Sequence, residues 1–291
     1  MRLGLHALGI GAGADRAVID AVASTADDCG FATLWAGEHV VMVDRPASRY
    51  PYSEDGVIAV PAQADWLDPM IALSFAAAAS SRIGLATGVL LLPEHNPVVV
   101  AKQAASLDRL GGGRLTLGIG VGWSREEFAA LSVPFARRAE RTAEYVAAMR
   151  AVWRDDIASF DGDFVSFDSI RVNPKPVRDR HIPIVVGGNS DSALRRAATW
   201  ADGWYGFNLD GVEAVHDRLA ELERLCAEAG RDRGQLRLSV ALRDPGVGDV
   251  GALADLGIDE LVLVAAPPER PAAAAEWVSA LAERWMAGAP A

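Results

Sequence analysis

The feature that most constrains the fold is a repeated alternation of short apolar runs with amphipathic stretches. Eight runs of four to ten residues are almost unbroken in hydrophobic character, and each is followed by sequence with apolar residues at helical spacing. Strands that are apolar on both faces are typical of a parallel sheet covered by helices. The expected strands are residues 2–8, 33–36, 83–92, 115–120, 183–186, 203–207, 236–242 and 260–264.

Residues that start and stop helices support the same division. Asp15 and Gly30 bracket the first helix, and a proline follows Asp68 and Asn96 at the start of two later helices. One continuous helical stretch is expected from Arg125 to Trp153. The alternation breaks twice. Residues 42–65 read as a long irregular loop, and residues 155–181 read as an insertion that contains a hairpin.

The length of 291 residues would allow two domains, but eight strand–helix units use nearly all of it. We therefore expect an α/β fold, a (β/α)8 TIM barrel that forms a single domain over residues 1–291. A doubly wound open sheet is the alternative. In such barrels the site lies at the C-terminal ends of the strands, so the long loop after the second strand is expected to act as a lid.

Composition excludes several classes of function. The net charge is −11, which argues against binding nucleic acid or an anionic membrane. The two cysteines cannot build a disulfide framework, and no His/Cys cluster has the spacing of a metal site. The first residues lack the anatomy of a signal peptide, and no apolar stretch is long enough to span a bilayer. A cytoplasmic location is expected.

The residues just after each strand are the candidates for chemistry. His39, preceded by Glu38, follows the second strand, and an imidazole beside a carboxylate suits acid–base work near pH 7. The alternative is a histidine that only hydrogen-bonds loop backbone. His6 follows the first strand and lies either in the barrel mouth or against a helix. His95 lies beside a helix cap and is expected to pack there.

Two glycine-rich turns are also candidates. Gly187-Gly188-Asn189-Ser190 joins a late strand to a helix, where free N–H groups bind phosphate, so a phosphate site is expected here. The alternative is a tight turn with a capping serine. Gly118 to Gly122 is no dinucleotide-binding fingerprint, but it lets a flat group pack near Trp123. Motifs of serine hydrolases and zinc hydrolases are missing from the sequence.

Taken in order and spacing, several segments resemble the luciferase-like monooxygenase superfamily, and within it the actinobacterial coenzyme F420-dependent branch. The resemblance covers most of the chain. Its segments are Gly30 to His39, Ile83 to Val89, Asn96 to Lys102, Leu107 to Leu110, Gly113 to Trp123, Asn173 to Pro176, Pro183 to Gly188 and Ala201 to Trp204.

The resemblance implies roles for particular residues. It implies that His39 approaches the isoalloxazine or deazaflavin ring, with Glu38 orienting or polarising it. It also implies a non-prolyl cis peptide between Gly88 and Val89 behind the ring. The turn that begins at Gly187 matches the family's phosphate-binding segment. One departure is Trp123, which stands where some F420-dependent sugar-phosphate dehydrogenases have an acidic glutamate.

The leading hypothesis is an F420-dependent oxidoreductase that passes a hydride between the deazaflavin and a small organic substrate. The pocket walls would include Trp35, Trp123 and Trp204, and local cations such as Lys102 and Arg125 would hold the anionic cofactor. The close rival is an FMN-dependent monooxygenase that uses reduced flavin and oxygen. A non-redox barrel that binds a phosphorylated ligand, or a cofactor-free scaffold, is a further alternative. Relatives are commonly homodimers, and a separate flavin or F420 reductase is a possible partner.

Overall fold

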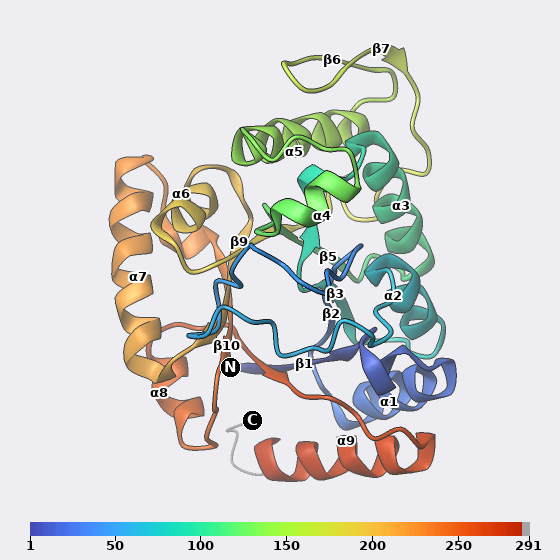
Figure 1. Ribbon diagram of the computed structural model, residues 1–291, viewed down its shortest axis with the longest axis vertical. Helices are drawn as coiled ribbons and strands as arrows, with labels where there is room; N and C mark the ends of the chain where they lie inside the picture. The colour runs from blue at the N-terminus through green and yellow to red at the C-terminus, as the bar shows by residue number, and fades with distance from the viewer. Residues whose placement is uncertain (287–291) are drawn as a thin grey trace.

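The computed structural model describes residues 1–286, and residues 287–291 of the expected domain lie outside the described part. Its centre is a closed barrel of parallel strands surrounded by helices, as predicted (Figure 1). Strands β3 and β4 share one position, so the ring has eight positions. The barrel strands are β1 (Arg2–Leu8), β2 (Thr33–Ala36), β3 (Gly84–Thr87), β4 (Leu90–Leu91), β5 (Leu115–Gly120), β8 (Ile184–Gly187), β9 (Gly203–Leu209), β10 (Arg237–Leu242) and β11 (Glu260–Val264).

Two features define how the ring closes. Strand β1 pairs with β11, from Arg2 beside Glu260 to His6 beside Val264. The expected third strand, 83–92, is divided into β3 and β4, and the Gly88–Val89 peptide between them is cis, as the family resemblance implied.

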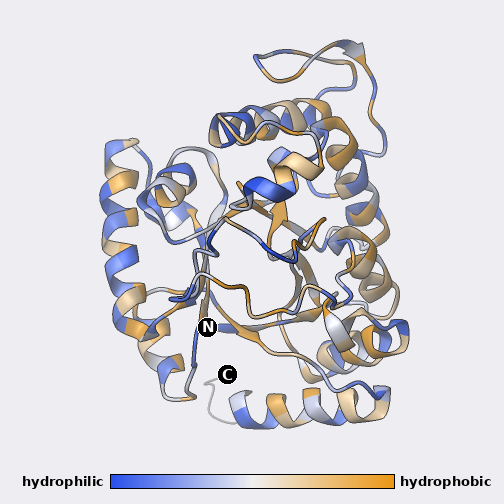
Figure 2. Ribbon diagram, in the orientation of Figure 1, coloured by the Kyte–Doolittle hydropathy of each residue, from blue (hydrophilic) through white to orange (hydrophobic). Residues whose placement is uncertain are grey.

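The helices cover the barrel from outside and begin where their caps predict. Asp15 accepts hydrogen bonds from two N–H groups of α1, and Gly30 ends that helix with φ of 85°. Figure 2 shows hydrophobic colour along the central strands and mixed colour along the helices, as expected for amphipathic helices around an apolar sheet. The helices are α1 (Arg16–Cys29), α2 (Pro69–Ala78), α3 (Pro97–Leu110), α4 (Arg125–Ala130), α5 (Arg138–Arg154), α6 (Asp191–Trp200), α7 (Gly211–Glu228), α8 (Asp249–Asp255) and α9 (Pro271–Met286), with short 3-10 turns η1 (Gly11–Ala14), η2 (Leu92–Glu94) and η3 (Arg233–Gln235).

The expected continuous helix from Arg125 to Trp153 is wrong. The structure divides it into α4 and α5, with residues 131–137 between them. Pro134 cannot donate a helical hydrogen bond, and Ser132 and Arg137 adopt positive φ angles of 59° and 56°. The division turns the short helix α4 toward the strand ends.

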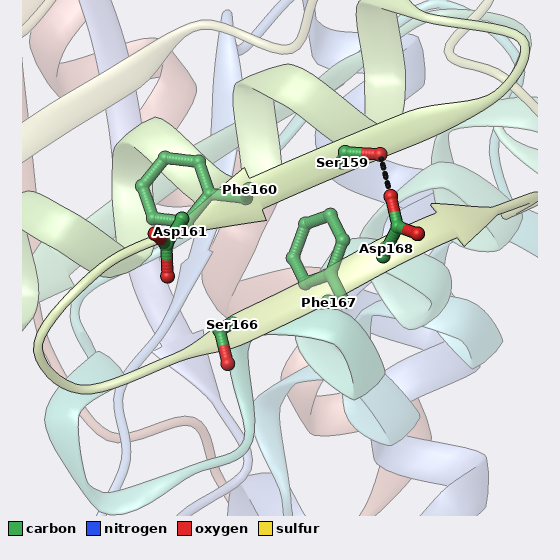
Figure 3. Close-up of a pocket in the computed structure, with 6 residues that line it drawn as sticks. All are labelled: Ser159, Phe160, Asp161, Ser166, Phe167 and Asp168. Atoms are coloured by element: carbon green, nitrogen blue, oxygen red, sulfur yellow. Dashed lines mark hydrogen bonds between the residues drawn. The ribbon is translucent and has the colours of Figure 1, made fainter.

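The insertion forms the antiparallel hairpin expected there, from β6 (Ala158–Asp161) and β7 (Ser166–Ile170). It projects beyond α5, outside the ring of helices (Figure 1). Figure 3 shows a hollow along this hairpin, where the rings of Phe160 and Phe167 lie side by side and Ser159 donates to Asp168 at 2.7 Å. The hollow lies on the outer hairpin and contains none of the strand-end residues.

Residues 37–68, here called the mouth loop, join β2 to α2 and cross the C-terminal end of the barrel (Figure 1). The loop is longer at both ends than the expected 42–65. Its backbone N–H groups at Ala47 and Ser48 donate to Glu126 of α4, and its carbonyl at Tyr52 accepts from Asn208 of β9. The loop is therefore attached to two sides of the opening. In residues 1–286 no helix is long and apolar enough to cross a membrane.

Candidate active site

His39 lies directly after β2 and forms a buried pair with a carboxylate of α4. Its Nδ1 is 2.7 Å from Oε2 of Glu127, whose side chain is fully buried. The other oxygen of Glu127 accepts the backbone N–H groups of Val40 and Val41 at 2.8 and 3.1 Å. A carboxylate that binds Nδ1 fixes the imidazole orientation and leaves Nε2 for a ligand.

The expected pairing of Glu38 with His39 is wrong. Glu38 points the other way, where Oε2 accepts the N–H of Leu91 at 2.6 Å and Oε1 lies 3.0 Å from Nε2 of His95. Neighbouring side chains of an extended segment face opposite sides, so adjacent residues in sequence are poorly placed to contact each other. Glu127 therefore has the role that the sequence assigned to Glu38.

His95 does more than pack beside a helix cap. Burial lowers the pKa of its imidazole, but the hydrogen bond and negative charge of Glu38 outweigh burial, so the pKa is raised. The Glu38–His95 pair links the end of β2 to the turn before α3 and fixes this side of the mouth.

Glu94 is a third buried carboxyl between these two pairs. Its side chain is 7% exposed, and neither carboxyl oxygen has a hydrogen-bond partner within residues 1–286. Burial is the main cause that raises its pKa to about 9, and the charges of Glu127 and Glu38 add to the shift. Glu94 is therefore neutral at pH 7.

Aromatic side chains of the mouth loop and of the segment after β5 surround His39. The ring of Trp66 meets it edge-on with centroids 5.0 Å apart, and the ring of Trp123 does so at 5.7 Å. Trp123 is thus at the mouth, as expected. Tyr50 contacts Trp123, and Tyr52 contacts Phe207 of β9. These loop aromatics were missed, because the sequence gives no register between an irregular loop and the strand ends.

The other two tryptophans expected in the pocket differ from each other. Trp35 lies inside the barrel and stacks on Tyr205 with centroids 4.5 Å apart. Trp204 is wrong as a pocket wall, because it faces the surrounding helices and its indole donates to the carbonyl of Gly188 at 2.8 Å. Residues 204 and 205 alternate across the sheet, and an apolar run that is buried on both faces does not reveal which side faces in.

His6 lies in the barrel mouth, which settles the choice that the sequence left open. Its ring is near Phe207 and lies 3.1 Å from the position that a Cβ on Gly88 would take. Burial lowers the pKa of His6 to about 4, and its Nδ1 has no partner within residues 1–286. The imidazole is therefore neutral at pH 7 and offers an unpaired nitrogen.

Val89 forms the floor of the opening. A Cβ on Gly120 or on Gly187 would lie only 2.7 Å from a methyl of Val89. Both residues must therefore lack a side chain for Val89 to fit in this position. The neighbouring Gly188 has φ of 118°, where a side chain would be strained. The glycines at the ends of β5 and β8 thus give a flat surface around Val89.

The rest of the expected phosphate turn is only partly free for a ligand. Asn189 is occupied by β9, where its amide donates to the carbonyl of Phe207 at 2.6 Å and accepts the N–H at 3.1 Å. Ser190 caps α6 through a bond from the N–H of Ala193. The N–H of Gly188 also donates to the carbonyl of Tyr205 at 3.2 Å, so this N–H and the Asn189 amide both hold the turn against β9.

Three arginines gather beside this turn and the adjacent end of β5. Arg138 donates to the carbonyl of Gly122 at 3.0 Å, and both Arg138 and Arg125 stack on Phe135. Burial and then the charge of Arg138 lower the pKa of Arg196, so these two guanidiniums lie near each other. Within residues 1–286, none of Arg125, Arg138 and Arg196 forms an ion pair with a carboxylate.

Arg125 was expected among the local cations, whereas Arg138 and Arg196 were not singled out. Lys102, the other expected cation, donates to the backbone carbonyl of Asn173 in the segment after the hairpin. Its ammonium group is thus occupied away from the three arginines.

Comparison with known proteins gives the same picture. A model of the family described as luciferase-like monooxygenase matches residues 3–243. An uncharacterized protein of Mycobacterium tuberculosis is 36% identical over 273 residues, which cover 93% of this chain and 95% of the relative. The FMNH(2)-dependent dimethylsulfone monooxygenase of Pseudomonas putida is 31% identical over 156 residues, which cover 53% of this chain and 42% of that enzyme.

Among solved structures, the coenzyme F420-dependent tetrahydromethanopterin reductase of Methanopyrus kandleri is similar in fold. The TM-score is 0.75 and the identity 15%, with 98% of each chain covered. The family model matches most of the chain, and the mycobacterial relative is similar over nearly its whole length. The structure places His39 at the barrel mouth, where the family resemblance expected it. This chain belongs to the luciferase-like monooxygenase family and is an oxidoreductase of that family.

Proposed function

We propose that the protein is an F420-dependent oxidoreductase that transfers a hydride between the deazaflavin and a small organic substrate at the barrel mouth. The observation that carries this proposal is the group of three arginines without carboxylate partners, Arg125, Arg138 and Arg196, on a chain of net charge −11. F420 is strongly anionic, with a phosphate and an acidic tail. Unpaired guanidiniums beside a glycine-rich turn suit such a group.

The residues at the opening fit a flat ring. Val89 and the glycines around it give an apolar surface, and His39 lies at the rim with Nδ1 committed to Glu127. The bound cofactor would supply the hydride chemistry. His39 would use its free Nε2 to hold or move a proton at the reacting atom, and Glu127 would stabilise the imidazole when it is charged.

The aromatic side chains of the mouth loop, together with Trp123 after β5, would exclude water from the reacting atoms. Trp66 and Trp123 flank His39, and Tyr52 lies near Gly188 at the phosphate turn. The mouth loop would therefore cover both the ring and the start of the anionic tail. A low-dielectric site strengthens the charge interactions that position a cofactor.

The second candidate is an FMN-dependent monooxygenase of the same family. It is favoured by the similarity to the FMNH(2)-dependent enzyme of Pseudomonas putida. FMN carries one phosphate and no acidic tail, so it would use the turn at Gly188 but would need fewer arginines. In that reaction, reduced FMN would come from a separate reductase.

The deciding experiment is a binding titration of the purified protein with F420 and with FMN. The proposal expects micromolar or tighter binding of F420, with Arg138→Ala weakening F420 more than FMN because only F420 brings the acidic tail. Binding of FMN without binding of F420 would reject it in favour of the second candidate. Binding of neither would reject the cofactor assignment for this site.

We also propose that the chain forms a homodimer. Helix α2 has no charged residue and is apolar on both faces, with Ile71 58% exposed and Phe75 39% exposed. A helix that is apolar all round is usually covered on every side. Sedimentation of the protein and of Ile71→Glu tests this, since the substitution should shift the mass to that of a monomer.

A further inference from the structure

Glu94 is a buried acid at the mouth that the proposed reaction does not use and that, unlike Glu38, has no hydrogen-bond partner within residues 1–286. It ends η2, and both of its oxygens lack a hydrogen-bond partner within residues 1–286 although the side chain is only 7% exposed. One of these oxygens lies 3.0 Å from the position that a Cβ on Gly122 would occupy. An ionised carboxylate buried there without a hydrogen-bond partner would be strongly destabilised, because it loses its hydration without compensation.

The groups that face Glu94 do not supply a compensating cation. The end of β2 brings Glu38, which is already bound to His95, and α4 brings Glu127, which is bound to His39. Both nearby carboxylates therefore repel an ionised Glu94, while both imidazoles are already committed to another acid.

Helix α5 also packs against η2, but its arginines are directed elsewhere. Arg138 donates to the carbonyl of Gly122, and Arg141 donates to the carbonyls of Pro134 and Ala136. Helix α3, which follows His95, contributes Lys102, whose ammonium binds the carbonyl of Asn173. Burial, lack of a partner and two flanking carboxylates all act in the same direction.

We propose that Glu94 is kept as a neutral carboxylic acid and serves as a positioning residue for the His39–Glu127 pair. Its protonated form adds no charge beside the two flanking carboxylates, whose negative charges act on Glu94. The neutral acid lets Glu127 remain the charged partner of His39. Loss of that proton places a third negative charge beside Glu127 and changes the charge felt by His39.

The cluster then behaves as a coupled system. Glu94 is expected to release its proton near pH 9, and the imidazole of His39 should respond to that step because Glu127 connects the two. The importance of His39 for the reaction rests on the proposed function, whereas the protonation of Glu94 does not. The test therefore uses the protein without cofactor.

The first measurement is infrared difference spectroscopy of the wild-type protein between pH 7 and pH 10. We expect a carboxylic-acid C=O band that disappears with a midpoint near pH 9. The band should be missing in Glu94→Gln and unchanged in Glu213→Gln, a matched control whose carboxylate is exposed on α7. A wild-type protein without such a band overturns the proposal, whatever the variants do.

The second measurement follows the His39 imidazole by NMR over the same pH range. The wild type and Glu213→Gln should show a shift of the His39 signals near pH 9, and Glu94→Gln should lose that step while keeping its fold. If Glu94 had only a structural role, the shift of the His39 signals near pH 9 would remain in Glu94→Gln. If the step persists in Glu94→Gln, Glu94 does not act on His39 and the positioning role is rejected.

Discussion

The two sides of the barrel mouth differ in how their charges are satisfied. On the acid side, formed by Glu38, Glu94, Glu127, His39 and His95, Glu127 pairs with His39, Glu38 pairs with His95, and Glu94 is buried without a partner within the described residues. On the basic side, formed by Arg125, Arg138 and Arg196, Arg138 donates to a carbonyl, Arg125 and Arg138 stack on Phe135, and none of the three forms an ion pair within the described residues.

This difference suggests different roles for the two sides, one in the reaction and one in cofactor binding. Paired buried groups are preorganised, because their orientation and charge are fixed before a ligand arrives. Unpaired cations that repel one another gain most when an anion enters between them. The acid side is therefore built to act on the reacting atoms, and the basic side to hold the anionic part of a cofactor.

The largest expected effect comes from breaking the acid side at Glu127. Glu127→Gln removes the charge that orients and stabilises His39, so turnover should fall by about 10²–10⁴-fold. The matched control is Glu126→Gln on the same helix, because Glu126 holds the mouth loop through Ala47 and Ser48 but does not contact His39. Steady-state rates at saturating substrate measure the difference. Equal losses in both variants would mean that loop attachment, and not His39, explains the effect.

The next effect tests the basic side on helix α6. Arg196→Ala should weaken cofactor binding by about 10-fold to 100-fold, since a hydrogen bond to a charged group contributes about 1.5–3 kcal/mol. Its neighbour Arg195 is already paired with Glu228, so Arg195→Ala is the control and should leave affinity nearly unchanged. Isothermal titration with the cofactor measures both. Similar losses in the two variants would contradict a specific site at Arg196.

A third prediction concerns His6, which lies deep in the mouth and belongs to neither side. Its pKa is about 4 in the folded protein and 6.5 in the reference state, so only the unfolded chain takes up its proton between these values. Stability should therefore fall as the pH drops from 6.5 toward 4, by about 2 kcal/mol at pH 5. Urea unfolding of the wild type and of His6→Gln over this range isolates the contribution. If the unfolding free energies of the two proteins change in parallel with pH, His6 is solvated in the folded protein.

The smallest effect should come from salt. Raising the ionic strength should weaken cofactor binding a few-fold through the basic side, because partly exposed charges are screened. The rate at saturating cofactor should change little, because the His39–Glu127 pair is buried. A titration series in sodium chloride measures affinity and rate together. A rate that follows the affinity would contradict the separation between the two sides.

Much of the fold could be predicted from sequence, because apolar runs and capping residues are local signals. The strands and the barrel were predicted within a few residues, and the position of His39 after β2 followed from them. The continuous helix over 125–153 was wrong, because Pro134 and the positive φ angles of Ser132 and Arg137 interrupt it.

The site was harder to predict because its contacts are long-range. Glu127 lies 88 residues after His39, and no local pattern in the sequence joins the two. The available signal was a glutamate in the first turn of a helix that starts at a strand end. The sequence also could not show whether Trp204 or Tyr205 points into the barrel, because both faces of that strand are buried.

The pairing of β1 with β11 has a consequence for how the chain folds. The first strand finds its last neighbour only when residues 260–264 are available, so the ring cannot close early during synthesis. Until then β1 presents an open edge, which is the kind of surface that aggregates. His6 is part of this seam and pairs with Val264. The mouth of the barrel is thus completed only after β11 has been made.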